Sequence, residues 1–288
     1  MHHVLLHLNL IEGVGPATVS RLIKTFETLS DLYQVTQPEL VHQFGLSPVM
    51  AEKIVVGLSD AHALHRELVL LEKYQIKTTS VMDDDYPSLL REIYAPPMVL
   101  YYQGELPWHT QNMLAFVGSR KANDYARQAV AELVPPLVAL GWVTVSGGAL
   151  GADSMVHQET LNAGGKTIAV LGSGLLCSYP SANRSLFKSI AERGGAVVSS
   201  FPVAAPPQAG NFPARNRIIS GLSRGCVVVQ AAAKSGALIT AKHALEQGRD
   251  VFAIPGKIDD SLSEGCHQLI QQGAKLVGGA GDIISEYQ

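Results

Sequence analysis

The feature that most restricts the fold of this chain is an alternation, from Met113 onward, of short apolar runs with longer segments of helical periodicity. Short apolar runs are typical of strands buried on both faces of a sheet, and a helix between two of them indicates a crossover. The pattern predicts an α/β fold with a Rossmann-like, doubly wound and mainly parallel sheet. The expected strands are Leu114–Val117, Trp142–Val145, Thr167–Leu171, Ala196–Val198, Cys226–Val229 and Val251–Ile254. The expected helices are Tyr125–Leu140, Ala152–Ala163, Asn183–Arg193, Asn216–Leu222 and Gly236–Gln247.

The first 75 residues have a different pattern, with short helices that follow Gly-rich turns. Gly13–Pro16 precedes a helix expected over Ala17–Phe26, and Gly45–Pro48 precedes one over Val49–Leu58. These resemble helix-hairpin-helix units, in which backbone N–H groups of the turn can bind a DNA phosphate. The alternative is a helical module that packs or binds a partner, and the acidity of the region favours it. A further helix is expected over Asp60–Tyr74.

Residues 76–111 are expected to form a connector. Val99–Tyr102, followed by Gly104, predicts an edge strand. Three consecutive aspartates, 83–85, are interpreted as a solvated turn, because a metal site requires further spaced ligands. We therefore expect a small all-α domain at 1–75, a connector with an edge strand at 76–111, and a Rossmann-like domain at 112–288.

Glycines and small polar residues follow the expected strands of the second half. Carboxyl ends of parallel strands lie at one edge of a sheet, where ligands bind, and glycine lets a backbone approach an oxygen anion closely. The number of such strand ends is larger than one mononucleotide would occupy. A row of them could bind the successive phosphates of a single nucleic-acid strand. Binding should then be independent of sequence. The candidate phosphate-binding residues at these ends are Gly118, Ser119, Arg120, Gly147, Gly148, Gly151, Lys234, Ser235, Gly236 and Thr240.

A second group of candidates lies in the stretch FPARNRIISGLS, residues 212–223. Arg215, Asn216 and Arg217 precede an apolar, helix-compatible run, so two guanidinium groups are expected beside a helix N-terminus. Both the guanidinium groups and the positive end of the helix dipole favour an anion there, and phosphate is the anion expected.

Four aromatic residues lie near these loops and could stack on bases, although core packing is the preferred interpretation of each. They are Tyr125, Tyr179, Phe201 and Phe212.

Charge is unevenly distributed along the chain. Residues 1–106 contain 7 Lys and Arg against 13 Asp and Glu, whereas residues 209–257 contain 7 against 2. The overall net charge of −3 therefore conceals a basic segment around residues 212–223. A local positive field of this kind attracts polyanions. The alternative is that these basic residues are spread over a solvated surface.

Asp153 and His157 are four residues apart on one expected helix face and could form a general acid and base pair. The preferred interpretation is that both support the preceding glycine-rich loop. The sequence contains no GxSxG nucleophile motif and no Walker-type GxxxxGK[ST], so we expect no catalytic residue, no metal and no cofactor.

Three scattered cysteines, without CxxC spacing, indicate neither a disulfide framework nor a zinc site. No apolar stretch approaches the length of a membrane span, and the N-terminus lacks a basic, apolar leader. A cytoplasmic protein is expected.

Several motifs occur together in a fixed order over residues about 80 to 280: FVGSRKA, VSGGALGADSMVH, GGKTIAVLGSGL, FPARNRIISGLS, KSGALITAKHALEQGRDVFAIPG and SEGCHQLIQQGAKLV. They resemble the bacterial DNA-processing protein A family (DprA, also called Smf). The resemblance implies a Rossmann-like DNA-binding domain after a sterile-alpha-motif-like helical domain. It also implies a homodimer that binds single-stranded DNA and loads the RecA recombinase onto it during natural transformation.

The chain departs from the family pattern in three respects. Leu150 stands where the family usually has an arginine, so we expect one backbone contact to be either missing or supplied from elsewhere. Ser200 and Gln230 replace two carboxylates that the family often carries. The C-terminal winged helix of many members has no counterpart before Gln288, so the chain is a short form or a truncated one.

Three functions are consistent with an α/β chain that carries anion-binding loops. The leading hypothesis is a non-enzymatic, sequence-independent binder of single-stranded DNA that acts as a recombination mediator. The alternative is a nucleotide-processing enzyme similar to phosphoribohydrolases, but Pro255-Gly256-Lys257-Ile258 lacks the second Gly and the Glu of the PGGxGTxxE motif of that group. A purely structural module would leave the anion-binding loops without a role.

Overall fold

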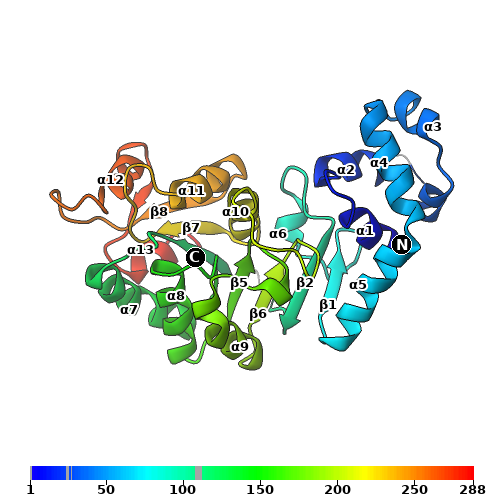
Figure 1. Ribbon diagram of the computed structural model, residues 1–288. Coiled ribbons are helices and arrows are strands. Elements are labelled where there is room, and N and C mark those ends of the chain that lie inside the picture. The colour runs from blue at the N-terminus through cyan, green and yellow to red at the C-terminus, as the bar shows by residue number, and fades with distance from the viewer. Residues whose placement is uncertain (1, 24–25, 27, 108–111) are drawn as a thin grey trace.

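The fold is built around a nine-stranded sheet. The structure is a computed structural model that describes residues 2–23, 26, 28–107 and 112–288. The strand order is β1-β2-β6-β5-β4-β3-β7-β8-β9 (Figure 1). All neighbouring pairs from β6 to β9 are parallel, whereas the β1–β2 and β2–β6 pairs are antiparallel, so β2 alone runs against the other strands. The strands are β1 (Lys77–Ser80), β2 (Val99–Gly104), β3 (Met113–Val117), β4 (Val143–Ser146), β5 (Thr167–Leu171), β6 (Ala196–Ser199), β7 (Gly225–Val228), β8 (Asp250–Ala253) and β9 (Lys275–Leu276).

Helices cover both faces of the parallel part of this sheet. One apolar cluster joins α7 and α8 to β3 and β7, and another joins α10 and α11 to the opposite side of the same strands. This two-layer cover is the doubly wound arrangement expected from the alternation in the sequence. The helices of this half are α7 (Asp124–Ala139), α8 (Ala152–Asn162), α9 (Arg184–Glu192), α10 (Asn211–Gly221), α11 (Ala237–Glu246), α12 (Glu264–Gln271) and α13 (Ala280–Ile284).

The N-terminal helices, coloured blue to cyan in Figure 1, pack against the β1–β2 end of the sheet. Ser47 caps α4 by accepting a hydrogen bond from the Met50 N–H at 3.2 Å, and Asp60 caps α5 in the same way through Ala63 at 3.1 Å. Leu5 and Ile54 belong to one core with sheet residues, so this region is not loosely tethered. Its elements are α1 (His2–Asn9), α2 (Pro16–Ile23), the short helix Leu29–Tyr33, α3 (Gln37–His42), α4 (Pro48–Ser59) and α5 (Ala61–Lys73).

The six strands and five helices expected after Met113 are confirmed, with shifts of a few residues at their ends. In the N-terminal region, helices are present at all three expected places. The end of the helix expected over Ala17–Phe26 includes residues 24 and 25, which lie outside the described residues, as do residues 108–111 of the expected connector. The domain boundaries at 75 and 111 stay predictions.

Two expectations were wrong. The strand at Val99–Tyr102 is not at the edge of the sheet, because β1 pairs outside it; the polar sequence Lys77–Ser80 gave no apolar signal for that strand. Helix α10 begins at Asn211 rather than near Asn216. Pro213 lies in its first turn, where its missing N–H removes no intrahelical hydrogen bond.

The sheet has a topological switch point between β3 and β7. From β3 the chain continues to β4 on one side, whereas β7, on the other side, is reached only after β6 and α10. Loops that follow β3 and β7 therefore diverge and leave a crevice at the carboxyl ends of both strands, where α/β proteins bind ligands. Within the described residues, no helix is both long and apolar enough to span a bilayer.

Candidate nucleic-acid interface

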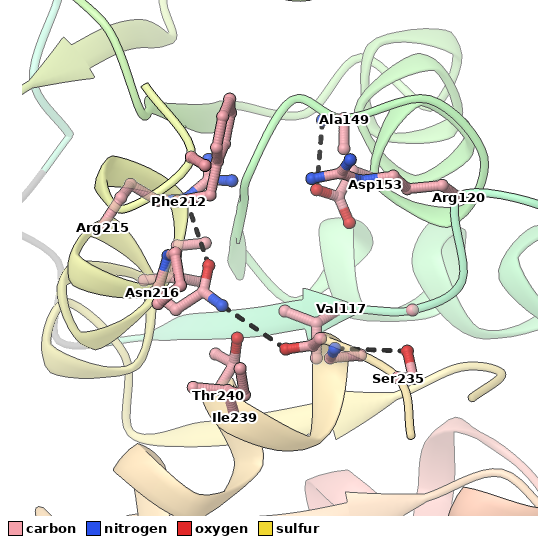
Figure 2. Close-up of a pocket in the computed structure, with 16 residues that line it drawn as sticks. Val117, Arg120, Ala149, Asp153, Phe212, Arg215, Asn216, Ser235, Ile239 and Thr240 are labelled. Carbon is pink, nitrogen blue, oxygen red and sulfur yellow. Dashed lines mark hydrogen bonds between the residues drawn. The ribbon is translucent and has the colours of Figure 1, made fainter. Parts of the chain in front are cut away.

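The crevice at the switch point is a pocket of about 570 Å³ (Figure 2). It lies between the loop after β3, the start of α8, helix α10 and the start of α11. Loops far apart in sequence thus contribute to one site, as expected from the strand ends. The sequence-predicted residues that line it are Gly118, Arg120, Asp153, Arg215, Asn216, Ser235, Gly236 and Thr240.

The glycine-rich loop after β4 closes one side of this pocket. A Cβ at Gly147 would lie 2.6 Å from Oδ2 of Asp153 and 2.7 Å from the guanidinium nitrogens of Arg215. Gly151 has a φ of +79°, and a Cβ there would lie 2.3 Å from the Ser119 carbonyl oxygen. A side chain at Gly151 would be strained and would clash with backbone, whereas a Cβ at Gly147 would force the Asp153 carboxyl or the Arg215 guanidinium group to move.

Arg215 is buried under this loop, with 4% of its surface exposed. It comes from the second turn of α10 and not from the helix N-terminus, and its Nη1 donates to the carbonyls of Gly147 and Val170. Burial lowers the pKa of Arg215 to about 10, with the nearby carboxyl of Asp153 opposing that shift. The side chain therefore stays cationic near neutral pH and adds positive potential to the pocket floor.

Asp153 and His157 support the loop from α8. Oδ2 of Asp153 accepts a hydrogen bond from the Ala149 N–H at 3.1 Å, and burial raises the pKa of this carboxyl. His157 is fully buried, with Nδ1 2.7 Å from Oγ1 of Thr167, and burial lowers its pKa to about 3. A neutral imidazole closed off from the pocket is poorly suited to general acid or base chemistry. This geometry favours the loop-supporting interpretation.

Arg120 is the solvent-facing cation of the pocket. Its guanidinium carbon lies 5.5 Å from the ring centroid of Phe212, a cation–π distance. The ring of Tyr179 meets Phe212 edge-on at 5.8 Å. Arg120 has no hydrogen bond or ion pair with any residue that the structure describes, so its donors remain available to an anion.

The interpretation of the nearby aromatic residues as core was wrong for two of them. Tyr125 and Tyr179 are exposed, and Phe212 is half-buried at the pocket wall. Tyr125 and Phe212 lie in the first turns of α7 and α10, and Tyr179 lies in the segment before α9, so the pattern of apolar runs did not show which way these rings point.

The start of α11 forms the wall opposite the glycine-rich loop. Asn216 Nδ2 donates to the Gly236 carbonyl at 3.4 Å, and Asn216 Oδ1 accepts from Nε of Arg215 at 3.3 Å (Figure 2). Thr240 is buried one turn into α11 and also lines the pocket. Asn216 thus links the buried arginine to the loop that begins α11, although Lys234 in that loop points to solvent and does not line the pocket.

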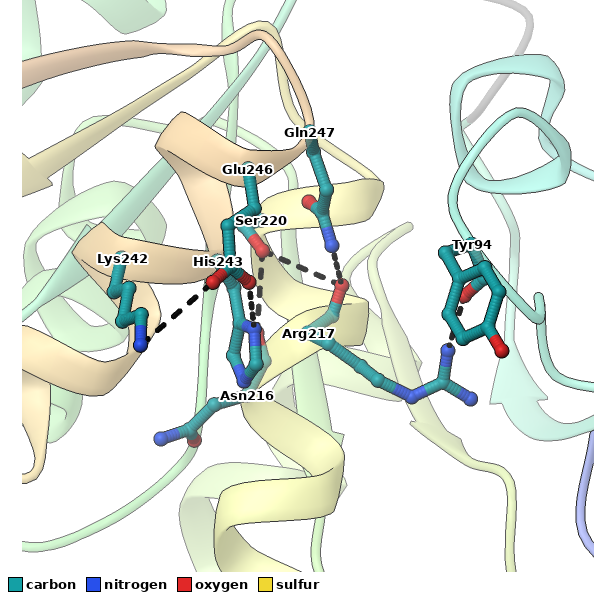
Figure 3. A network of polar contacts seen from close by, with 8 residues as sticks. All are labelled: Tyr94, Asn216, Arg217, Ser220, Lys242, His243, Glu246 and Gln247. Atoms are coloured by element: carbon teal, nitrogen blue, oxygen red, sulfur yellow. Dashed lines mark hydrogen bonds and ion pairs between the residues drawn. The ribbon is translucent and has the colours of Figure 1, made fainter. Parts of the chain in front are cut away.

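Arg217 does not belong to this pocket. Its Nη1 donates to the carbonyl of Tyr94 at 3.1 Å, on the other side of α10 (Figure 3). The same nitrogen donates to the carbonyl of Ala95 at 2.5 Å. Burial lowers its pKa, and the Gln247 amide donates to its backbone carbonyl at 3.0 Å. The expectation that both arginines flank one anion at a helix N-terminus is therefore corrected, because residues two apart on a helix face nearly opposite directions.

Two supporting residues were missed by the sequence reasoning. Asn183, buried at the start of α9, donates through Nδ2 to the carbonyl of Gly148 at 2.8 Å. Gln230, at the end of β7, accepts from the Asn123 N–H at 3.2 Å and donates to Asp260 at 3.1 Å. These three bonds join residues that are at least 30 positions apart in sequence, so no local pattern indicates them.

Leu150, at the position where the family resemblance implies an arginine, is 48% exposed and lines a small hollow next to the pocket with Arg120 and Tyr179. The site therefore has one cation fewer than the family pattern implies. Arg120 and Arg215 are the arginines that line the pocket.

Comparison with known proteins agrees with this fold. The chain is 41% identical over 275 residues to the Smf protein of Synechocystis, covering 93% of this chain and 68% of that one. The crystal structure of DNA processing protein A from Streptococcus pneumoniae superimposes with a TM-score of 0.86 at 36% identity, covering 100% of this chain and 99% of that chain.

A third similar protein is DNA processing protein A from Helicobacter pylori, whose structure was described for its single-stranded DNA binding mode. It aligns with a TM-score of 0.67 at 28% identity, covering 74% of this chain and 95% of that one. The family model for DNA recombination-mediator protein A matches residues 77–288, which is most of the chain and the whole parallel sheet. The chain therefore belongs to the DNA recombination-mediator protein A family, DprA/Smf.

Proposed function

We propose that this protein binds single-stranded DNA through its phosphates at the switch-point pocket, without sequence preference. The observation that carries the proposal is the pairing of two cations around one glycine-rich loop: Arg215 buried beneath it and Arg120 exposed in front of it. A DNA phosphate bound by Arg120 would also be attracted by the positive potential of the buried Arg215. The Helicobacter relative, which binds single-stranded DNA, supports the same assignment.

The start of α11 would supply the second half of the phosphate site. Ser235 and Gly236 lie at its positive end and line the pocket, and Gly236 has nothing within 4 Å of where a Cβ would stand. Backbone there can therefore approach a phosphate oxygen closely. Gly118, Ser119, Gly147, Gly148, Gly151, Lys234 and Thr240 complete the set proposed to hold or shape the strand near this point.

Phe212 would stack on a base beside the bound phosphate. Its ring is already fixed between Arg120 and Tyr179, so little side-chain entropy is lost when a base binds. Stacking is tolerant of sequence because every base has a π face. This accounts for strand binding without base-edge recognition.

The site supports binding better than catalysis. Asp153 and His157, the only acid and base candidates from the sequence, are buried and engaged with Ala149 and Thr167. The described residues contain no cluster of three or more His, Cys, Asp or Glu that could hold a metal ion. We therefore propose a non-enzymatic protein that needs no cofactor.

The wider role follows from membership of the recombination-mediator family. We propose that the protein acts in the cytoplasm as a homodimer and loads the RecA recombinase onto single-stranded DNA during natural transformation. These partners are proposals that rest on the family resemblance.

Fluorescence anisotropy with labelled single- and double-stranded oligonucleotides at two salt concentrations tests the function. We expect tighter binding to the single strand, nearly equal affinity for different sequences, and a loss of affinity at the higher salt. Equal binding of both forms, or no binding, would contradict the proposal. Release of free base from nucleoside monophosphates would instead support the phosphoribohydrolase-like alternative.

A further inference from the structure

Tyr94 exposes 89% of its surface, more than any other tyrosine that the structure describes. It lies in the segment between α6 (Ser88–Arg91) and β2, next to the buried Ile93. A single exposed side chain needs no special explanation. The backbone that carries this ring, however, is unusually constrained.

Three features fix that backbone. Arg217 donates with one nitrogen to the carbonyls of Tyr94 and Ala95, and Figure 3 shows the first of these contacts. Ala95 has a φ of +50°, a left-handed conformation that costs a residue with a Cβ about 1–2 kcal/mol. The Pro97 carbonyl then accepts a hydrogen bond from the buried Tyr86 hydroxyl at 2.8 Å. A solvent-exposed ring is thus presented on a rigid and locally strained segment, as in sites where pre-organisation matters.

The ring borders a second cavity, of about 620 Å³, on the far side of α10 from the switch-point pocket. Arg217, His243 and Gln247 form one wall, and the turn that contains Gly15 and Pro16 forms another. The N-terminal helical region therefore contributes part of this wall through the first of its hairpin-like turns.

The lining of this cavity carries two arginines, Arg217 and Arg249, and two glutamates, Glu92 and Glu246, so its formal charges sum to zero. Arg249 lies 3.8 Å from Glu92, Glu246 lies 3.3 Å from His243, and Arg217 is occupied by backbone carbonyls. A phosphate would gain little here. A neutral, planar heteroaromatic group that stacks on Tyr94 suits the lining better.

The two cavities are adjacent along the same pair of helices. Asn216 lines the switch-point pocket and Arg217, the next residue, lines the second cavity. On α11, Thr240 lines the first and His243, three residues later, lines the second. A strand anchored by phosphate at Arg120 would have to pass over α10 and α11 to reach Tyr94.

We propose that Tyr94 is a base-stacking residue and that the second cavity binds a nucleobase of the same single strand whose phosphate lies in the switch-point pocket. The inference rests on the proposed single-stranded DNA binding. It also gives the N-terminal helical region a place beside the bound strand.

The test compares Tyr94→Ala with Tyr94→Phe in the full chain, using oligothymidylates of increasing length in anisotropy titrations. Short oligonucleotides that fill only the switch-point pocket should bind both variants like the unaltered protein. Longer ones should bind Tyr94→Ala about tenfold more weakly, with an unchanged salt slope, and bind Tyr94→Phe normally. Tyr74→Ala, another exposed tyrosine at the end of α5, is the matched control.

A second readout places the fluorescent base 2-aminopurine at successive positions of the longer oligonucleotide. One position should be quenched on binding to the unaltered protein and to Tyr94→Phe, but not to Tyr94→Ala. If Tyr94→Ala binds oligonucleotides of every length with normal affinity, the inference about Tyr94 is overturned and the proposed function is not affected. A changed oligomeric mass of that variant would also overturn the inference, because it would assign the ring to a protein interface. Failure of the unaltered protein to bind any oligonucleotide overturns the proposed function as well.

Discussion

Arg215 and Arg217, two residues apart on α10, donate to backbone carbonyls on opposite sides of the helix: Arg215 to Gly147 and Arg217 to Tyr94. Each arginine therefore fixes a different segment of chain to the same helix. Arg215 holds the glycine-rich loop from within, whereas Arg217 holds the segment that leads to β2. Neither has a guanidinium group free to act only as a DNA contact.

Replacing Arg215 with Met should therefore destabilise the fold. The change removes the Arg215 donor from two buried carbonyls and leaves the buried Asp153 without its nearby cation. We expect a loss of about 3–5 kcal/mol in the free energy of unfolding, against about 1–2 kcal/mol for Arg217→Met, whose site is less buried. Urea denaturation followed by circular dichroism measures both. Equal stability of the two variants would contradict this account of Arg215.

Replacing Arg120 should affect DNA affinity and leave stability nearly unchanged, in contrast to Arg215. Because its guanidinium group is exposed and has no polar partner among the described residues, Arg120→Ala should change stability by no more than about 0.5 kcal/mol. Single-strand affinity should fall, and the slope of log K against log salt should decrease by about 0.7. Arg127→Ala, an exposed arginine on α7 outside the pocket, is the control. An unchanged slope in Arg120→Ala would remove this residue from the DNA contact.

Two glycines of the site allow a matched comparison. Gly147→Ala introduces a Cβ within 2.7 Å of both Asp153 and Arg215, so the loop or the charged pair must move. Gly236→Ala, at the start of α11, meets nothing within 4 Å. We expect Gly147→Ala to lower both the melting temperature and single-strand affinity, while Gly236→Ala keeps the melting temperature. A melting temperature for Gly147→Ala equal to that of the unaltered protein would contradict the close packing.

Much of the fold could be predicted from sequence because buried parallel strands leave a strong local signal. The run Thr167–Leu171, for example, matches β5 residue for residue. β1 is short and polar, and β9 has only two residues, so neither carries an apolar run; pairing with β2 and β8 makes them strands.

The site was predictable as a set of strand-end loops, but not in the roles of its residues. The sequence pairs Arg215 with Arg217 by proximity along the chain, yet the helix separates them and tertiary contacts decide where each points. The start of α10 was misplaced because Pro213 and Asn211 do not show helical periodicity. The availability of Arg120 depends on its neighbours in space, which no local pattern encodes.

His157 should make stability depend on pH. Its pKa is about 3 in the folded protein, whereas an unperturbed histidine, as in the unfolded chain, has a pKa of 6.5. Between pH 3 and pH 6.5 the unfolded chain therefore binds a proton at His157 that the folded chain does not. The free energy of unfolding should then fall by about 1.4 kcal/mol per unit as the pH drops through this window.

Asp153 has the opposite effect on the pH dependence of stability. Its raised pKa means that, just above pH 3.8, the folded chain keeps a proton that the unfolded chain has lost. The difference between the unaltered protein and His157→Asn isolates the histidine, since Asn can still bond Thr167. We expect His157→Asn to show a shallower loss of stability from pH 6 to 4 in urea denaturation. Identical slopes would show that His157 does not set this dependence.

Gln230 shows why a carboxylate does not suit that position in this chain. Its amide accepts from the Asn123 N–H and donates to Asp260 Oδ2 at 3.1 Å, and its side chain is buried. Gln230→Glu would remove the amide N–H that donates to Asp260 and place two carboxylates together. We expect a loss of about 1–3 kcal/mol at neutral pH, which acid conditions relieve as one carboxyl is protonated.

Asp260→Asn provides the partner for a double-mutant cycle. With Gln230→Glu it restores a donor opposite the new carboxylate, so the double variant should recover much of the stability that Gln230→Glu loses. Thermal denaturation of the four proteins measures this coupling. If the two effects simply add, the contact between residues 230 and 260 does not determine the side chain at 230, and the reason for glutamine there lies in another contact of the same loop.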